Sequence, residues 1–252
     1  MKKYLMTVVA ALAAASFTSC SNEMDMFDPI SSEKATIDLN ITNDDAVVTR
    51  AEQTASKADW WAKMGSTWAK ASTLEGKTYT PGDYTIQVGN YQSEADAMEA
   101  NSGAGDAYYT LEKEVTLVKG TNTVTFPCGK AKNGKVTVDW SGTAGIAGLA
   151  MTSVVAEQTS KSRTYTFTGN GTAYFYAGVD IVCTINYTYN NQPKSIVKTI
   201  SKPAAATQYA FNVSANSNGT ITTLTITYDD EFGTGGTTST TIDAATGAEA
   251  TN

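Results

Sequence analysis

The chain has 252 residues, a formal net charge of −7 and no histidine. An acidic chain without a basic cluster argues against nucleic acid as a partner. The absence of histidine excludes a Ser-His-Asp triad, a Cys-His pair and histidine-bound zinc, and no other residue set predicts a metal or cofactor site. We therefore expect a non-catalytic protein. Its many Thr, Val, Ile and Tyr residues suit pleated, half-buried strands.

The N-terminus carries an export signal. Lys2 and Lys3 precede an apolar run over residues 8–15, which is shorter than the roughly 20 residues of a membrane span. The run leads to Phe17-Thr18-Ser19-Cys20, which resembles the lipobox of bacterial lipoproteins, with Phe17 at the position where leucine is usual. That resemblance implies a diacylglycerol on the Cys20 thiol and removal of residues 1–19.

Residues 20–33 are expected to form an acidic tether. Glu23 and Asp25 resemble the signal that sends Bacteroidetes lipoproteins to the outer face of the outer membrane. We therefore expect an outer-membrane, surface-exposed protein. Its membrane contact is expected to be the N-terminal lipid, which would carry the two or more acyl chains that firm anchoring requires.

Residues 34–132 are predicted to form a first antiparallel β-sandwich. Ile37, Leu39 and Ile41 alternate with polar residues, which indicates a strand. Residues 46–80 are interpreted as two strands around the turn at residues 65–67. A strand follows at Tyr84, Ile86 and Val88, then a short helix over 93–100 that Ser93 caps. Two further strands are expected over residues 108–118 and 121–128.

Residues 133–232 are predicted to form a second antiparallel sandwich, which makes the fold all-β with two tandem immunoglobulin- or transthyretin-like domains. Its strongest alternation runs over residues 179–189, and Asn190-Asn191 turns that strand into the next, over 196–200. Asn-Gly pairs suit the positive φ angles of hairpin turns. Residues 233–252, rich in Gly, Thr, Ala and Ser, are expected to be a disordered tail.

If Cys20 is acylated, Cys128 and Cys183 remain. They permit one disulfide closing a loop of about 55 residues, worth about 3–4 kcal/mol by the loop-entropy model. They suit two buried thiols equally well, because both lie in phase with the apolar side chains of their strands.

Short motifs carry a family resemblance over residues 35–230. They are the segments 81–86 (PGDYTI), 108–109 (YY), 124–128 (VTFPC) and 135–139 (KVTVD). They resemble Bacteroidetes surface lipoproteins with a domain of unknown function (the 4493 type), which are similar in architecture to fimbrillins. The family implies no activity and no catalytic residues.

The resemblance to fimbrillins adds a processing site. Fimbrillin precursors are cut after an arginine, which frees their first strand and opens a groove for a neighbour's strand. Arg50 stands where such a cut would release residues 20–50. The alternative is a solvated arginine in a loop.

Three tryptophans lie close in sequence and suggest a binding surface. Trp60, Trp61 and Trp68 could stack on sugar rings, or they could fill the first core, where tryptophan is mostly found. The sequence thus predicts a surface lipoprotein acting in adhesion or fimbria-like assembly, with a glycan or a protein as partner. The alternative is a glycan-binding accessory lipoprotein of a polysaccharide uptake system.

The lipid anchor generates a first prediction. Cells expressing the protein and fed a palmitate analogue should label it, and Cys20→Ala should abolish the label because no acceptor thiol remains. The labelling is read by gel fluorescence, with Cys128→Ala as the matched control that keeps it. Label retained in the Cys20→Ala protein would contradict the anchor.

Overall fold

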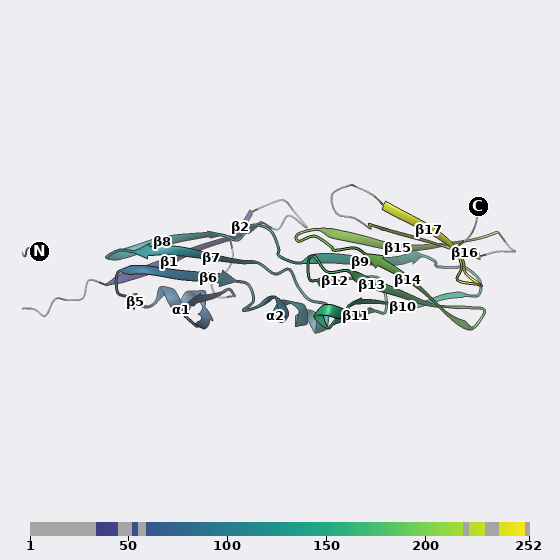
Figure 1. Ribbon diagram of the computed structural model, residues 1–252, viewed down its shortest axis with the longest axis horizontal. Coiled ribbons are helices and arrows are strands. Elements are labelled where there is room, and N and C mark those ends of the chain that lie inside the picture. Colours follow the sequence, from purple (N-terminus) through teal and green to yellow (C-terminus); the bar gives the residue numbers. More distant parts are fainter. Residues whose placement is uncertain (1–33, 45–51, 55–58, 219–221, 230–236, 250–252) are drawn as a thin grey trace, which may run out of the picture. The chain divides into compact units, whose positions relative to one another are not determined.

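The computed structural model describes residues 34–44, 52–54, 59–218, 222–229 and 237–249. In this part of the chain, strands β1 to β17 are accompanied only by two short α-helices and two 3-10 helices (Figure 1). The expected all-β sandwich architecture is therefore confirmed. Among the same residues, no helix has the length and apolar character needed to cross a membrane.

The first described half builds two four-stranded sheets around one core, whose buried residues run from Ala35 to Ala131. One sheet holds β1 (Ala35–Asp44), β2 (Glu52–Thr54), β5 (Thr78–Tyr79) and β8 (Gly120–Pro127). The other holds β4 (Thr67–Lys70), β3 (Trp61–Met64), β6 (Gly82–Gly89) and β7 (Thr110–Leu117), in that order.

Local sequence explains the connections of this half. The expected pair of strands around residues 65–67 is present as β3 and β4, and Gly65 takes the positive φ of 80° that their tight turn requires. Helix α2 (Glu94–Glu99) begins where predicted, because the Ser93 side chain accepts a hydrogen bond from the Asp96 amide. Helix α1 (Ala71–Glu75) was not predicted.

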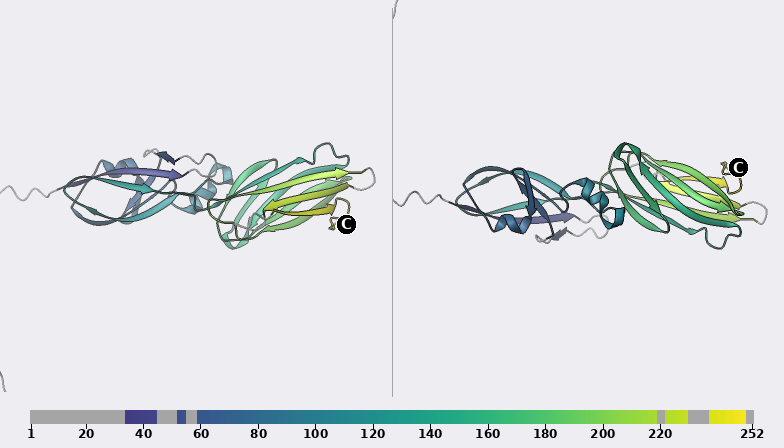
Figure 2. Two further views of the ribbon diagram at one scale, coloured as in Figure 1. Left: turned by 90° about the horizontal axis from the view of Figure 1, so that it is seen from above. Right: turned by 90° about the horizontal axis from the view of Figure 1, so that it is seen from below.

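The second described half also forms a sandwich around its own core, from Val136 to Ala244. One sheet runs β11 (Arg163–Phe167), β10 (Leu149–Gln158), β13 (Ile181–Tyr189) and β14 (Gln192–Ile200). The other runs β12 (Gly171–Phe175), β9 (Gly134–Gly142), β15 (Gln208–Ser217), β16 (Thr222–Asp229) and β17 (Thr237–Asp243). The last three strands lie side by side in Figure 2.

The sheets are not wholly antiparallel. Strand β1 pairs in parallel with β8, and β9 pairs in parallel with β15. Parallel partners need a long crossover connection, and in both pairs the intervening chain supplies strands of the opposite sheet. Residues 34–252 together form one compact unit.

The prediction of a disordered tail over residues 233–252 is wrong for residues 237–249. Strand β17 pairs with β16 over seven residues, and Ile242 and Ala244 are buried in the second core. The polar average composition of the segment concealed its one large apolar residue, Ile242. The burial of Ile242 and the hydrogen bonds between β16 and β17 offset the entropy lost when the strand is ordered. Residues 233–236 and 250–252 lie outside the described residues.

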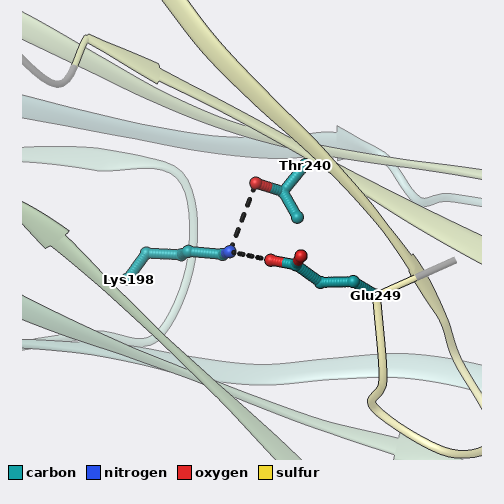
Figure 3. Close-up of polar contacts among 3 residues, drawn as sticks. All are labelled: Lys198, Thr240 and Glu249. Atoms are coloured by element: carbon teal, nitrogen blue, oxygen red, sulfur yellow. Dashed lines mark hydrogen bonds and ion pairs between the residues drawn. The ribbon is translucent and has the colours of Figure 1, made fainter. Parts of the chain in front are cut away.

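A polar contact joins the two sheets of the second sandwich beside β17. The Lys198 ammonium on β14 donates to Thr240 Oγ1 at 3.2 Å and lies 3.3 Å from Glu249 Oε1 (Figure 3). Glu249 is largely exposed, so the ion pair contributes at most about 1 kcal/mol. The Lys198 side chain therefore lies between β14 and β17, which are the edge strands of the two sheets.

The placement of β17 generates a stability prediction. Ile242→Ala should lower the free energy of unfolding by about 2–4 kcal/mol, because it removes buried methyl groups and leaves a cavity. Urea denaturation followed by circular dichroism measures the change. Thr241→Ala, at the exposed neighbouring position, should shift stability by less than about 0.5 kcal/mol. Equal effects of the two variants would contradict the burial of β17.

Candidate functional site

Strand β1 is embedded in the first core. Its inward side chains Ala35, Ile37, Leu39 and Ile41 are each at most 3% exposed. Along one side its backbone pairs with β8 over eight consecutive positions. With four fully buried side chains and continuous pairing with β8, β1 contributes a large share of the packing and backbone hydrogen bonding in the first sandwich.

The other side of β1 is only partly paired with backbone. β5 covers its first two residues and β2 its last three. Between them the Leu39 amide donates to Glu75 Oε1 at 2.7 Å, so the end of α1 satisfies a strand amide that no neighbouring strand reaches. Glu75 was not identified from the sequence, since nothing local marks it as the partner of a residue 36 positions away.

Of the three tryptophans singled out above, Trp60 cannot contact a surface ligand, because it is buried. It is 6% exposed, belongs to the first core, and its ring centroid lies 6.5 Å from that of Tyr109. It shares the inward face with Ala62, two residues on, as strand alternation requires.

Trp61 and Trp68 lie on the outer face of the same hairpin and are half-buried. Each is paired across the strands with a lysine: Trp61 with Lys70, and Trp68 with Lys63. The lysine ammonium groups stand over the indole rings, 4.1 Å from the Trp61 centroid and 5.3 Å from that of Trp68. These cation–π contacts contribute roughly 0.5–1 kcal/mol each at exposed sites.

A shallow hollow of about 320 Å³ continues this face toward β6 and β7. The strand register sets Trp68, Lys63, Gln87 and Glu112 in one row across the sheet, and the last three line the hollow. The row is polar and carries both charge signs, so it suits hydrogen bonding to a polar partner more than burial of an apolar one. The lysines over the indole rings must move before a planar ligand can stack there.

The two cysteines lie in different cores and are free thiols. Cys128 belongs to the first core and Cys183 to the second, and both are buried. The disulfide is therefore absent, and two buried thiols are what the structure contains. Burial raises the pKa of Cys128 to about 12, against a smaller lowering by Lys132, and burial raises the pKa of Cys183 to about 12.

Arg163 is a buried residue that the sequence did not single out. It is 8% exposed, and its guanidinium donates to the carbonyl oxygens of Gly103 (2.6 Å), Ala104 (3.1 Å) and Tyr174 (3.0 and 3.2 Å). Its charge also lies over the Phe175 ring at 5.3 Å. Burial lowers the pKa of Arg163, although an arginine stays charged at any physiological pH. The side chain thus fixes the loop after α2 against the second sandwich.

The remaining predicted sites lie outside the described residues. These are Cys20, with the leader 1–19 and the tether 20–33, and the processing site Arg50. Within the described ranges, no group of three or more Cys, Asp or Glu side chains is arranged to hold a metal ion.

The chain belongs to the family described as Domain of unknown function (DUF4493), whose model matches residues 33–244. The resemblance found in the sequence is therefore confirmed, and the match includes β17. Among curated proteins, none matches the chain.

Solved structures similar to the chain include three from Bacteroides and Parabacteroides. A candidate cell adhesion protein from Bacteroides ovatus is 12% identical, with a TM-score of 0.41, covering 79% of this chain and 98% of its own. A fimbrial assembly protein from Parabacteroides distasonis is 11% identical, with a TM-score of 0.38 and coverage of 81% and 97%. A candidate cell adhesion protein from Bacteroides fragilis is 14% identical, with a TM-score of 0.38 and coverage of 72% and 75%.

The buried thiols generate a chemical prediction. Because their pKa is raised to about 12, native protein carrying Cys20→Ala should resist alkylation by iodoacetamide at pH 8, whereas in urea both thiols should react at once. Mass spectrometry counts the added groups. Since the folded state keeps protons that the unfolded state loses, stability should also fall as pH rises above about 9. An alkali-stable fold, or a mass showing a disulfide, would contradict this arrangement.

Proposed function

We propose that this protein is a non-catalytic surface lipoprotein of the outer membrane, held by lipid on Cys20, that acts in adhesion or fimbria-like assembly. The observation that carries the proposal is the position of β1. Strand β1 precedes Arg50 in the chain. It nevertheless supplies four buried side chains to the first core and pairs in parallel with β8.

The physical consequence of a cut after Arg50 supports the assembly role. Strand β1 would then be held by hydrogen bonds and burial alone. Its loss would leave the edge of β8 unpaired and the inward side chains of the first core without cover. Such an edge is a template for another extended segment, so a strand from a second copy could take the vacated place.

A second candidate is a glycan-binding accessory lipoprotein of a polysaccharide uptake system. It is favoured by the outward-facing, half-buried Trp61 and Trp68 beside a polar row on the same sheet. We rank it second because Lys63 and Lys70 stand over those rings.

The test uses the two arginines of the chain. An arginine-specific protease can cut only after Arg50 and Arg163, and Arg163 is buried and bound to three carbonyl oxygens. Cleavage of the purified Cys20→Ala protein should therefore occur at Arg50, as read by mass spectrometry. Oligomers should then appear in light scattering as β1 is exchanged for a strand of another copy.

The matched control is Arg50→Gln, which should remain uncut and monomeric under the same treatment. Excess synthetic peptide covering residues 34–44 should suppress the oligomers by refilling the place of β1. A cleaved chain that releases the segment ending at Arg50 and stays monomeric would refute the assembly role.

A further inference from the structure

One hollow assigned to no role lies at one end of the second sandwich, between the loop joining β9 to β10 and the turn before β12. It is an open hollow with a volume of about 560 Å³. Its lining is formed by Trp140, Ser141, Thr143, Ala144, Gly145, Leu149, Ala150, Met151 and Asn170. Trp140, Leu149 and Met151 pack on the core from its edge and are only partly buried, so they give the hollow an apolar floor.

Strands β9 and β10 each have a β-bulge beside the residues that line the hollow. Asp139 pairs with Asn212 and Gly142 with Ser214, so β9 has one residue more than β15 in the stretch that holds Trp140. On β10, Met151 pairs with Tyr187 but Ser153 with Asn186, so β10 has an extra residue directly after Met151. Bulges redirect side chains and are frequent beside functional sites.

The polar rim of the hollow is fixed in place by hydrogen bonds. The Asn170 side chain accepts from the Trp140 amide at 2.9 Å and donates to Asp139 Oδ1 at 2.7 Å. The same Asp139 oxygen accepts from the Ser141 amide at 2.8 Å. That backbone bond, followed by side-chain bonds from Ser141 and Asn170, lowers the pKa of Asp139, so the carboxylate that orients Asn170 stays charged.

The loop is equally well ordered. Thr143 returns two hydrogen bonds to the Trp140 carbonyl oxygen, from its amide at 3.0 Å and its hydroxyl at 2.8 Å. The Ala144 amide donates to the Ser141 carbonyl oxygen at 3.1 Å. A site that is already ordered loses little conformational freedom when it binds.

The lining determines the ligand class. It combines an indole ring and two aliphatic side chains with hydroxyl and amide groups, and none of the lining residues is charged. An anionic ligand would find no counter-charge there, and the Asp139 carboxylate beside Asn170 would repel it. A pyranose ring matches the lining, because its C–H face is apolar and its edge carries hydroxyl groups.

We propose that this hollow binds one pyranose unit of a neutral glycan, with Trp140 stacking on the sugar face and Asn170 hydrogen-bonding its hydroxyl edge. The inference rests on the proposed surface location and gives adhesion a ligand class. It places the sugar contact on the second sandwich and not at Trp61 or Trp68. The ammonium groups of Lys70 and Lys63 already lie over those two indole rings.

The experiment uses the whole chain carrying Cys20→Ala, screened on an array of gluco-, manno- and galacto-oligosaccharides together with sialylated and sulfated glycans. Binding to a neutral set is expected, and the best oligosaccharide is then titrated by tryptophan fluorescence. Trp140→Ala should weaken binding at least about tenfold, and Asn170→Ala about fivefold for one lost hydrogen bond.

Because Trp140 also packs on the core, a second variant tests the site without removing it. Ala150→Trp, at an exposed lining position, should fill the hollow and abolish binding while the melting temperature stays unchanged. Trp61→Ala and Trp68→Ala are the matched controls and should bind as well as the parent protein.

Three outcomes would overturn the proposal: no neutral glycan bound, only charged glycans bound, or binding that survives Ala150→Trp. Loss of binding in the Trp61→Ala or Trp68→Ala control would move the site to the first sandwich. None of these results alters the outcome of Arg50 cleavage, so failure of the sugar site and failure of the assembly role are distinguishable.

Discussion

The first sandwich depends on β1, because β2, β5 and β8 all pair with it and its inward side chains are buried against the opposite sheet. Its inward side chains are at most 3% exposed, and each methylene group they remove from water stabilises the fold by about 0.8 kcal/mol. The strand is nevertheless bound unevenly, with a full parallel ladder to β8 on one side and, on the other, short pairings separated by a side-chain bond from Glu75. Burial of these side chains and the ladder to β8 therefore both hold β1 in the first sandwich, whereas its other side is paired with backbone only near its two ends.

The second constraint is the contact between the loop after α2 and the second sandwich. Arg163 carries a buried charge, and its guanidinium donates to backbone carbonyl oxygens of Gly103, Ala104 and Tyr174. Nearby, the buried Asn133 side chain accepts from the Tyr108 amide and donates to the Asp106 carbonyl oxygen. Buried polar groups persist only when bonded. These two side chains therefore define how the loop after α2 meets the second sandwich.

Alternation in the sequence predicted most strands, because it records which side chains point inward. It located β1 and β13 and, with Gly65, the β3–β4 hairpin, but it could not show that β1 and β9 have parallel partners. Strand β10 escaped prediction because its bulge after Met151 breaks the alternation. Strand β17 escaped because Ile242 is the one large apolar residue among threonine, serine and aspartate, so no alternation of apolar side chains marks the strand. Pairing partners distant in sequence, such as Glu75 for Leu39, leave no local signal.

The same limit applies to the tryptophan cluster, because closeness in sequence does not show which face of the sheet each side chain occupies. Three tryptophans close in sequence fall on opposite faces of one hairpin, so Trp60 fills the core while Trp61 and Trp68 meet lysines across the strands. Trp140 stands alone in the sequence, and the residues that complete its hollow come from a loop and a turn separated by a whole strand pair. In a sandwich, sites form where loops from distant segments converge at the ends of the sheets. The contacts around Trp140, and not its neighbours in the sequence, therefore show which distant residues lie together at this end of the sandwich.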